Sequence, residues 1–338
     1  MTEKVQLDEM LAAVGQFHDE PALAPERRGD LRDGRVYVVT HEISTAIKVA
    51  IVTGRPLLIS GAPGCGKSSL ASYVARNLGL AYYEYTVTSM AQPQDLLWTV
   101  DTVRRLNDAQ LGILNSNNVA GSVYEYIEPG PLWWCLNPAT AQRRGASPDA
   151  GLQRPARPSN QLPGHSPGRP GAVLLIDEID KADSSFCNGL LVPLGSRQFF
   201  VSAIDTMVLA DEAQVPGSPI ILITTNNERD LPDAFVRRCV ALSIPAPSDD
   251  KLVEIALRHF GAEIEALEVR QQIAALAKRL ADGKQQGTST PAPSTAEFLD
   301  LVRTLLSLRI GIDSTEWAIV EQLIIEKRDV RSSRVLEW

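Results

Sequence analysis

The chain has 338 residues, of which 44% are apolar and 22% are charged, and its formal net charge is −8. This composition is typical of a globular protein with one large core and room for a second, smaller domain. The negative net charge argues against a protein that binds mainly to the phosphate backbone of nucleic acids.

The four cysteines are scattered, and the chain has no C-x-x-C pair of the kind that indicates a zinc site. The first ten residues lack the basic region and apolar stretch of a secretory signal. No apolar run approaches the roughly 18 residues of a membrane span. We therefore expect a cytoplasmic protein with reduced thiols and no membrane partner.

Residues 1–34 form a polar leader, and the apolar residues that follow, from Ile43 to Ile51, recur at helical spacing. Five apolar runs predict strands, which begin at Leu57, Ala81, Ala172, Ile220 and Val240. Helical segments between them predict parallel crossovers. The expected fold is an α/β domain over residues 35–246, with a five-stranded parallel sheet covered on both faces, followed by a small helical domain over 247–338.

Residues 138–171 are rich in proline, glycine and arginine and have no apolar periodicity. Such a composition buries too little apolar surface to offset the entropy cost of ordering, so it predicts a disordered insert. Its arginines could bind nucleic acid or an acidic partner, but a solvated tether is the simpler interpretation.

Residues 57–69 read LLISGAPGCGKSS, an apolar strand followed by the pattern G-x-x-x-x-G-K-S. Its glycines let backbone N–H groups close around the β- and γ-phosphates of a nucleoside triphosphate, and the next helix adds its positive end. Such a loop does not read the base, so ATP and GTP both stay open. The candidate residues are Gly61, Ala62, Pro63, Gly64, Cys65, Gly66, Lys67, Ser68 and Ser69.

The segment VLLIDEIDKAD places Asp177 and Glu178 at the carboxyl end of an apolar strand. Asp177 can hold Mg²⁺ together with the hydroxyl of Ser68. Glu178 points elsewhere and can polarise the water that attacks the γ-phosphate. An acidic turn after a buried strand is the alternative, which the upstream phosphate loop disfavours.

A further candidate is Asn226, at the end of the strand IILITT, where it can orient the attacking water. Arg237 and Arg238 follow the segment PDAFV. An arginine at a subunit edge can stabilise γ-phosphate charge in a neighbouring subunit, and Arg238 is the stronger candidate. A cap at Asn226 and surface ion pairs at the arginines are the alternatives.

The segments GAPGCGKSS, VLLIDEID, ITTNN and DAFVRRC, in this order, resemble the ring-forming AAA+ ATPases, and specifically their MoxR-like branch. The similarity covers about residues 35–310. It implies an AAA+ fold that uses ATP and Mg²⁺, with Lys67 and Ser68 on the phosphates and metal. It also implies that Asp177 and Glu178 are the metal-binding and catalytic acids, that Asn226 senses phosphate, and that Arg238 acts in trans.

The same resemblance implies a hexameric ring and a protein client, in some relatives with a von Willebrand A-type partner. Inserts at about residues 95–126 and 198–213 would face a central pore. One departure is Ala296, which stands where the family often has a lid arginine. Arg303 is a candidate substitute, although an exposed helical arginine is the simpler interpretation.

The sequence therefore predicts an ATP-hydrolysing ring protein that exerts force on partner proteins. A nucleic-acid motor or loader would share this nucleotide site, but the insert at 95–126 carries only Arg104 and Arg105 against several acids. A nucleotide-gated switch that hydrolyses too slowly to do work is the second alternative. The adjacent Trp133 and Trp134 could grip a client or divide between core and surface.

Overall fold

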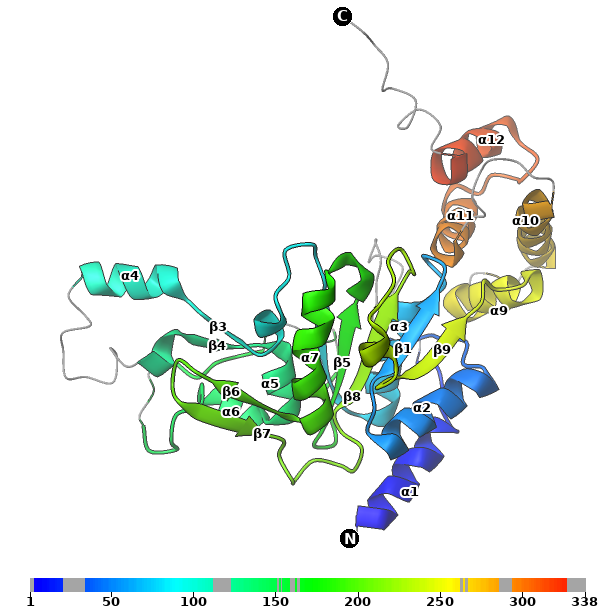
Figure 1. The fold of residues 1–338 in the computed structure, drawn as a ribbon. Helices are drawn as coiled ribbons and strands as arrows, with labels where there is room; N and C mark the ends of the chain where they lie inside the picture. Colours follow the sequence, from blue (N-terminus) through cyan, green and yellow to red (C-terminus); the bar gives the residue numbers. More distant parts are fainter. Residues whose placement is uncertain are drawn as a thin grey trace, which may run out of the picture.

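The computed structural model describes residues 3–20, 34–111, 123–150, 152, 154–158, 162, 165–261, 264, 267–285 and 294–326. Their centre is a five-stranded sheet in the order β2-β5-β8-β1-β9, with every neighbouring pair parallel (Figure 1). The strands are β1 (Leu57–Gly61), β2 (Ala81–Thr86), β5 (Ala172–Asp177), β8 (Ile220–Thr225) and β9 (Val240–Ile244). The predicted parallel sheet is confirmed.

Helices cover both faces of this sheet, because alternate strand residues point to opposite sides. Leu175 packs into the core of one face and Leu174 into that of the other. The first face is covered by α1 (Glu3–Val14), α2 (His41–Thr53) and α3 (Lys67–Leu78), and the second by α5 (Pro131–Leu136) and α7 (Ser184–Ser196). The predicted polar leader thus includes α1, whose Met10 and Val14 are buried.

The disorder predicted for residues 138–171 is wrong for the described part of that segment. It contains α6 (Pro138–Gln142), and Ala141, Ala146 and Ala156 are buried. The composition was misleading because small alanines make these contacts, and backbone hydrogen bonds such as Ala156 N to Gln142 O (2.9 Å) hold the loop. The remaining residues of the segment lie outside the described ranges.

Trp133 and Trp134 on α5 are both buried, at 0% and 7% exposure. The indole N–H of Trp133 donates to Thr140 Oγ1 (3.0 Å), so its polar edge is also satisfied inside the protein. Neither tryptophan is available to grip a client in this conformation.

Two antiparallel ribbons extend from the sheet domain where the inserts were predicted. The first pairs β3 (Trp98–Val100) with β4 (Ile127–Pro129) and carries α4 (Thr102–Gln110), which projects from the body (Figure 1). The second is the hairpin of β6 (Gln198–Val201) and β7 (Thr206–Leu209). Both expected inserts are therefore ordered elements wherever the structure describes them.

The C-terminal region is helical, as predicted. It consists of α9 (Asp249–Phe260), α10 (Leu267–Gln285), α11 (Thr295–Leu308) and α12 (Thr315–Glu321). The short helix α8 (Asp233–Val236) and strand β9 come before this region in the chain. Leu252, Phe298 and Trp317 form a core there that is separate from the two cores of the sheet. Among the described residues, no helix has the length and apolar character needed to cross a bilayer.

Candidate active site

The phosphate loop lies between the carboxyl end of β1 and the first turn of α3. Gly64 (φ 74°) and Gly66 (φ 93°) adopt left-handed backbone conformations, which residues with a Cβ rarely adopt. A Cβ on Gly66 would also lie 3.3 Å from a ring carbon of Tyr37. Glycine is thus required at these two positions, and α3 directs its N-terminal N–H groups toward this loop.

Lys67, at 6% exposure, anchors the loop to the neighbouring strand. Its ammonium donates to Gly61 O (2.8 Å), Ala62 O (2.9 Å) and Asn226 Oδ1 (2.8 Å). Three acceptors satisfy all three ammonium protons. Because these acceptors come from the loop and from the end of β8, the lysine charge is held where the two meet.

Ser68 and Asp177 form the second contact of the site. The Ser68 hydroxyl donates to Asp177 Oδ1 at 2.6 Å, and Asp177 is 2% exposed. The hydroxyl of Thr224, on β8, donates to the same carboxylate oxygen at 2.6 Å. Thr224 was missed from the sequence, because a threonine inside an apolar strand resembles any other β-branched strand residue.

Glu178 follows directly but is oriented differently. Its backbone N–H donates to Thr224 Oγ1 (2.9 Å), and its φ of 59° is left-handed, which is unusual for a residue with a Cβ. Its carboxylate pairs with Lys181, and this hydrogen bond raises the pKa of the Lys181 ammonium. The structure therefore places Glu178 beside the cluster, with its side chain engaged by a lysine that sequence reasoning did not consider.

Asp180 is a third residue that sequence reasoning missed. It is 1% exposed, and its Oδ2 accepts from the backbone N–H groups of Asn226 and Glu228, both at 2.9 Å. The segment after β5 is thereby joined to the segment after β8. The sequence Asp-Glu-Ile-Asp offered a signal for it. A third acid so close to a buried strand needs a hydrogen-bond partner, which indicates a structural role for Asp180.

A lysine, a serine, an aspartate and an asparagine thus lie at the carboxyl edge of the parallel sheet, where hydrogen bonds join Lys67 to Asn226 and Ser68 to Asp177. The AAA domain family (dynein-related subfamily) matches residues 56–239, which is more than half of the chain. The chain belongs to this family. The match begins just before β1 and ends just before β9, so it contains every motif described above.

A crystal structure of a putative ATPase from Cytophaga hutchinsonii is also similar, with a TM-score of 0.40 and 16% sequence identity, over 90% of this chain and 79% of that one. No curated protein matches this AAA domain chain. The family match confirms the predicted AAA+ resemblance at the level of the family, and the MoxR-like branch stays a prediction.

AAA domains generally bind ATP with Mg²⁺, and the residues of this AAA domain fit both groups. The Lys67 ammonium lies against the backbone of the glycine-rich loop, which is the arrangement that cradles phosphates. The Ser68 hydroxyl and the Asp177 carboxylate are adjacent oxygen donors, which is the ligand chemistry that Mg²⁺ prefers.

Arg237 and Arg238 are not part of this hydrogen-bonded cluster. Both are exposed at the end of α8, and Arg238 lines a cavity of about 280 Å³ between α2, α7 and α8. In the described part of the chain neither guanidinium has an ion-pair partner, so the surface ion pair considered for them is not observed there. The AAA domain thus presents both arginines at its surface, and their action in trans stays a prediction.

The helical region meets the phosphate loop at the start of α11. A Cβ on Gly64 would lie 2.4 Å from Cβ of Ser294, the N-cap residue of this helix. Arg303 instead pairs with Asp300 (3.7 Å) and lies over the ring of Phe260 (5.8 Å). In this conformation the contacts of Arg303 therefore lie within the helical region.

Proposed function

We propose that this chain is a MoxR-like AAA+ protein that hydrolyses ATP in a hexameric ring and uses the energy to remodel partner proteins. The observation that carries the proposal is the hydrogen-bonded chain from Asn226 to Lys67, beside the contact of Ser68 with Asp177. These four side chains come from three separate segments, and they converge where a triphosphate must lie if the glycine-rich loop holds it.

The residues have distinct roles in this proposal. Lys67 binds the β- and γ-phosphates, while Ser68 and Asp177 hold the metal. Held there, Mg²⁺ would supply positive charge that offsets the charge of the phosphates. Thr224 keeps the Asp177 carboxylate oriented through a hydrogen bond of 2.6 Å.

Glu178 acts as the general base for the attacking water. To do so its carboxylate has to leave Lys181, so the observed pair corresponds to a conformation in which the base is not yet directed at water. Asn226 orients the water, and its amide is close enough to Lys67 to share the same phosphate. Arg238 of one subunit stabilises γ-phosphate charge in the next.

The ion pairing of the two arginines on α4 favours a protein client over nucleic acid. Arg104 is occupied by Glu125 and Asp108, which leaves Arg105 as the one free cation on this helix in the described residues. A phosphate-binding surface needs several free cations. The proposed location in the cytoplasm and the von Willebrand A-type partner rest on the family resemblance.

The test is ATP turnover of the unmodified chain and of the Glu178→Gln variant. Loss of the base should lower turnover by roughly 10² or more while ATP still binds. Glu228→Gln makes the same chemical change at an exposed glutamate nearby and should leave turnover within about twofold. Negligible turnover in the unmodified chain would overturn the proposal in favour of a slow switch.

The trans role of Arg238 is tested by mixing two inactive variants, Arg238→Ala and Glu178→Gln. A mixed ring contains some interfaces where an intact Glu178 faces an intact Arg238, so mixing should restore part of the turnover. Two variants that stay inactive when mixed, although they assemble together, would show that Arg238 does not act across subunits.

A further inference from the structure

The arm formed by β3, α4 and β4 stands apart from the rest of the molecule (Figure 1). Its helix α4 is nine residues long and has no buried residue. A helix this short is not stable in water by itself, so the contacts that hold it decide which of its faces is presented to solvent.

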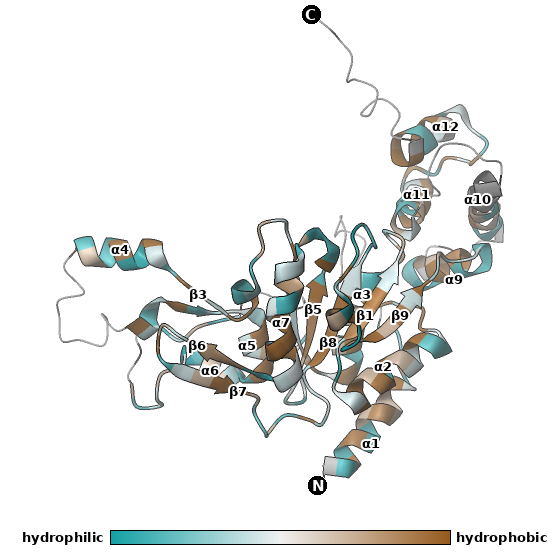
Figure 2. Ribbon diagram, viewed as in Figure 1, coloured by the Kyte–Doolittle hydropathy of each residue, from teal (hydrophilic) through white to brown (hydrophobic). Residues whose placement is uncertain are grey.

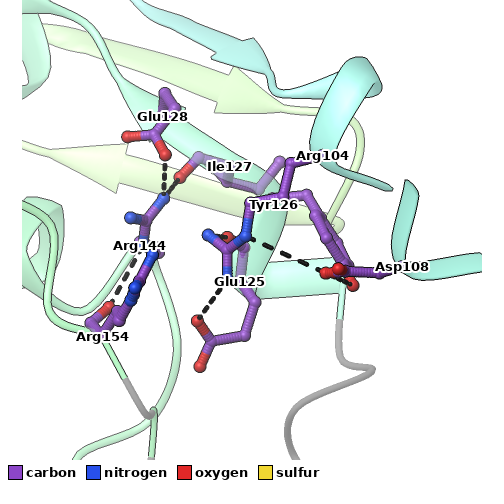
Figure 3. Close-up of polar contacts among 8 residues, drawn as sticks. All are labelled: Arg104, Asp108, Glu125, Tyr126, Ile127, Glu128, Arg144 and Arg154. Atoms are coloured by element: carbon purple, nitrogen blue, oxygen red, sulfur yellow. Dashed lines mark hydrogen bonds and ion pairs between the residues drawn. The ribbon is translucent and has the colours of Figure 1, made fainter. Parts of the chain in front are cut away.

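Polar side chains hold α4 to the base of the arm (Figure 3). Arg104 donates to Glu125 O (3.1 Å), pairs with the Glu125 carboxylate (3.8 Å) and lies over the ring of Tyr126 (5.5 Å). Tyr126 in turn donates its hydroxyl to Asp108 (2.9 Å), one turn along the helix. Arg104 and Asp108 therefore define the inward face of α4, and this face is charged.

The outward face of α4 is apolar. Val103 is 70% exposed and Leu106 is 60% exposed. At about 100° per residue, Leu106 lies about 160° around the helix from both Arg104 and Asp108. This amphipathic helix is thus inverted, because the face with Arg104 and Asp108 is turned toward the protein and the face with Leu106 toward solvent. In Figure 2, α4 contains both hydrophilic and hydrophobic residues.

The hairpin of β6 and β7 has a second unpartnered apolar face. Phe200 and Met207 are directly opposite each other in the ladder and are 48% and 51% exposed, and Leu209 on the same face is 53% exposed. The alternate residues Phe199 and Val208 are buried in the core of the sheet domain. Exposed apolar faces of this kind mark contact sites in soluble proteins.

The charges beside the two faces are opposite. Arg105 is exposed on α4 and has no ion-pair partner among the described residues. The hairpin carries the exposed Asp205 at its turn, and the exposed Glu212 follows β7. A contact between the faces would therefore bring Arg105 toward acidic residues.

We propose that the apolar face of α4 in one copy of this chain docks on the apolar face of the β6–β7 hairpin in a second copy. Each chain carries both surfaces, with matched apolar character and complementary charge, and no residue that the structure describes covers either surface. Where the contact is not returned across a two-fold axis, it is heterologous, and repeating it gives a closed ring or a filament. The inference rests on the proposed function only where that function requires subunits to assemble.

The test uses cysteines on the two faces in separate chains. Leu106→Cys protein is mixed with Met207→Cys protein in Mg·ATP and oxidised mildly, and a disulfide-linked dimer is scored on a non-reducing gel. The unmodified chain, with its four native cysteines, gives the background. Leu106→Cys mixed with Val192→Cys is the matched control, because Val192 is also an exposed apolar residue (63%) but belongs to α7 and not to the hairpin.

We expect the Leu106–Met207 mixture to form at least five times more cross-linked dimer than the control mixture or either variant alone. Equal yields in the two mixtures would overturn the inference. Strong cross-linking of Leu106→Cys protein with itself would also overturn it, because α4 would then pair with α4.

Leu106→Glu gives a second, independent readout. A charge on the docking face should raise the concentration at which subunits assemble by at least tenfold, while Val192→Glu should leave it unchanged. Normal ATP turnover with no specific cross-link would sink this inference alone. A specific cross-link in a chain without ATP turnover would support the contact and sink the proposed function instead.

Discussion

Lys67 and Asn226 are 159 positions apart in the chain, yet the Lys67 ammonium donates to Asn226 Oδ1 at 2.8 Å. The contact joins the phosphate loop after β1 to the end of β8, and the parallel pairing of β1 with β8 brings these two segments together. Any nucleotide that binds Lys67 therefore changes the environment of Asn226, and the reverse is also true.

Replacing Asn226 separates the two contributions of its side chain. Asn226→Ala removes the acceptor for Lys67 and the amide that we propose orients water, so turnover should fall roughly tenfold or more. Lys67 keeps its two backbone acceptors, so nucleotide affinity should change little. Asn226→Asp keeps an acceptor for Lys67 but cannot donate. The measurement is ATP turnover of the unmodified chain and of the two variants. Unchanged turnover in both variants would contradict the proposed role of Asn226 in orienting water.

Asp180 should contribute to stability as well as to the site. Asp180→Ala leaves the backbone N–H groups of Asn226 and Glu228 without their acceptor at a partly buried position. The unfolding free energy should fall by about 2–4 kcal/mol, and Asp180→Asn, which keeps an amide oxygen, should lose less. Urea unfolding measures this difference. Equal stability of the alanine variant and the unmodified chain would show that the strand ends are held by other contacts.

Arg144 should hold the alanine-rich loop after α6 in place. Its guanidinium donates to Glu128 Oε1 (2.7 Å) and to the backbone oxygen of Ile127, and the residue is 5% exposed. Arg144→Met should lower the unfolding free energy by about 2 kcal/mol, because the Ile127 carbonyl loses its donor. Limited proteolysis should then cut between residues 143 and 158 sooner than in the unmodified chain. Glu128→Gln keeps a hydrogen-bond acceptor and should resist cleavage, so early cutting in both variants would point to a different cause.

The cysteines should react slowly at neutral pH. Burial raises the pKa of the Cys65 thiol despite the nearby Lys67 charge, and it raises the pKa of Cys187 to about 11 and of Cys239 to about 12. Only the thiolate is nucleophilic, so alkylation by iodoacetamide should be slow at pH 7.5 and speed up as the pH rises toward these values. Free cysteine is the reference. Labelling of Cys65 faster than this reference at pH 7.5 would contradict the prediction.

Sequence patterns could predict the strands and the motifs at their ends, since local periodicity and glycine content carry that information. The patterns could not predict contacts made by residues that belong to no recognisable motif. The roles of Thr224 and Asp180 were identified only from their hydrogen bonds to Asp177 and Asn226 in the structure. For the same reason, the composition of residues 138–171 predicts a tether, whereas Ala141, Ala146 and Ala156 are buried.

By itself, the sequence determined the order of strands along the chain, the glycine-rich loop and the acids after β5, because each is a local pattern of residue types. The tertiary structure alone decided which strand ends are neighbours, which carboxylates are engaged and which face of α4 is turned outward. Those outcomes depend on pairing between distant segments and on the hydrogen-bond partners of buried polar groups, neither of which a local pattern encodes.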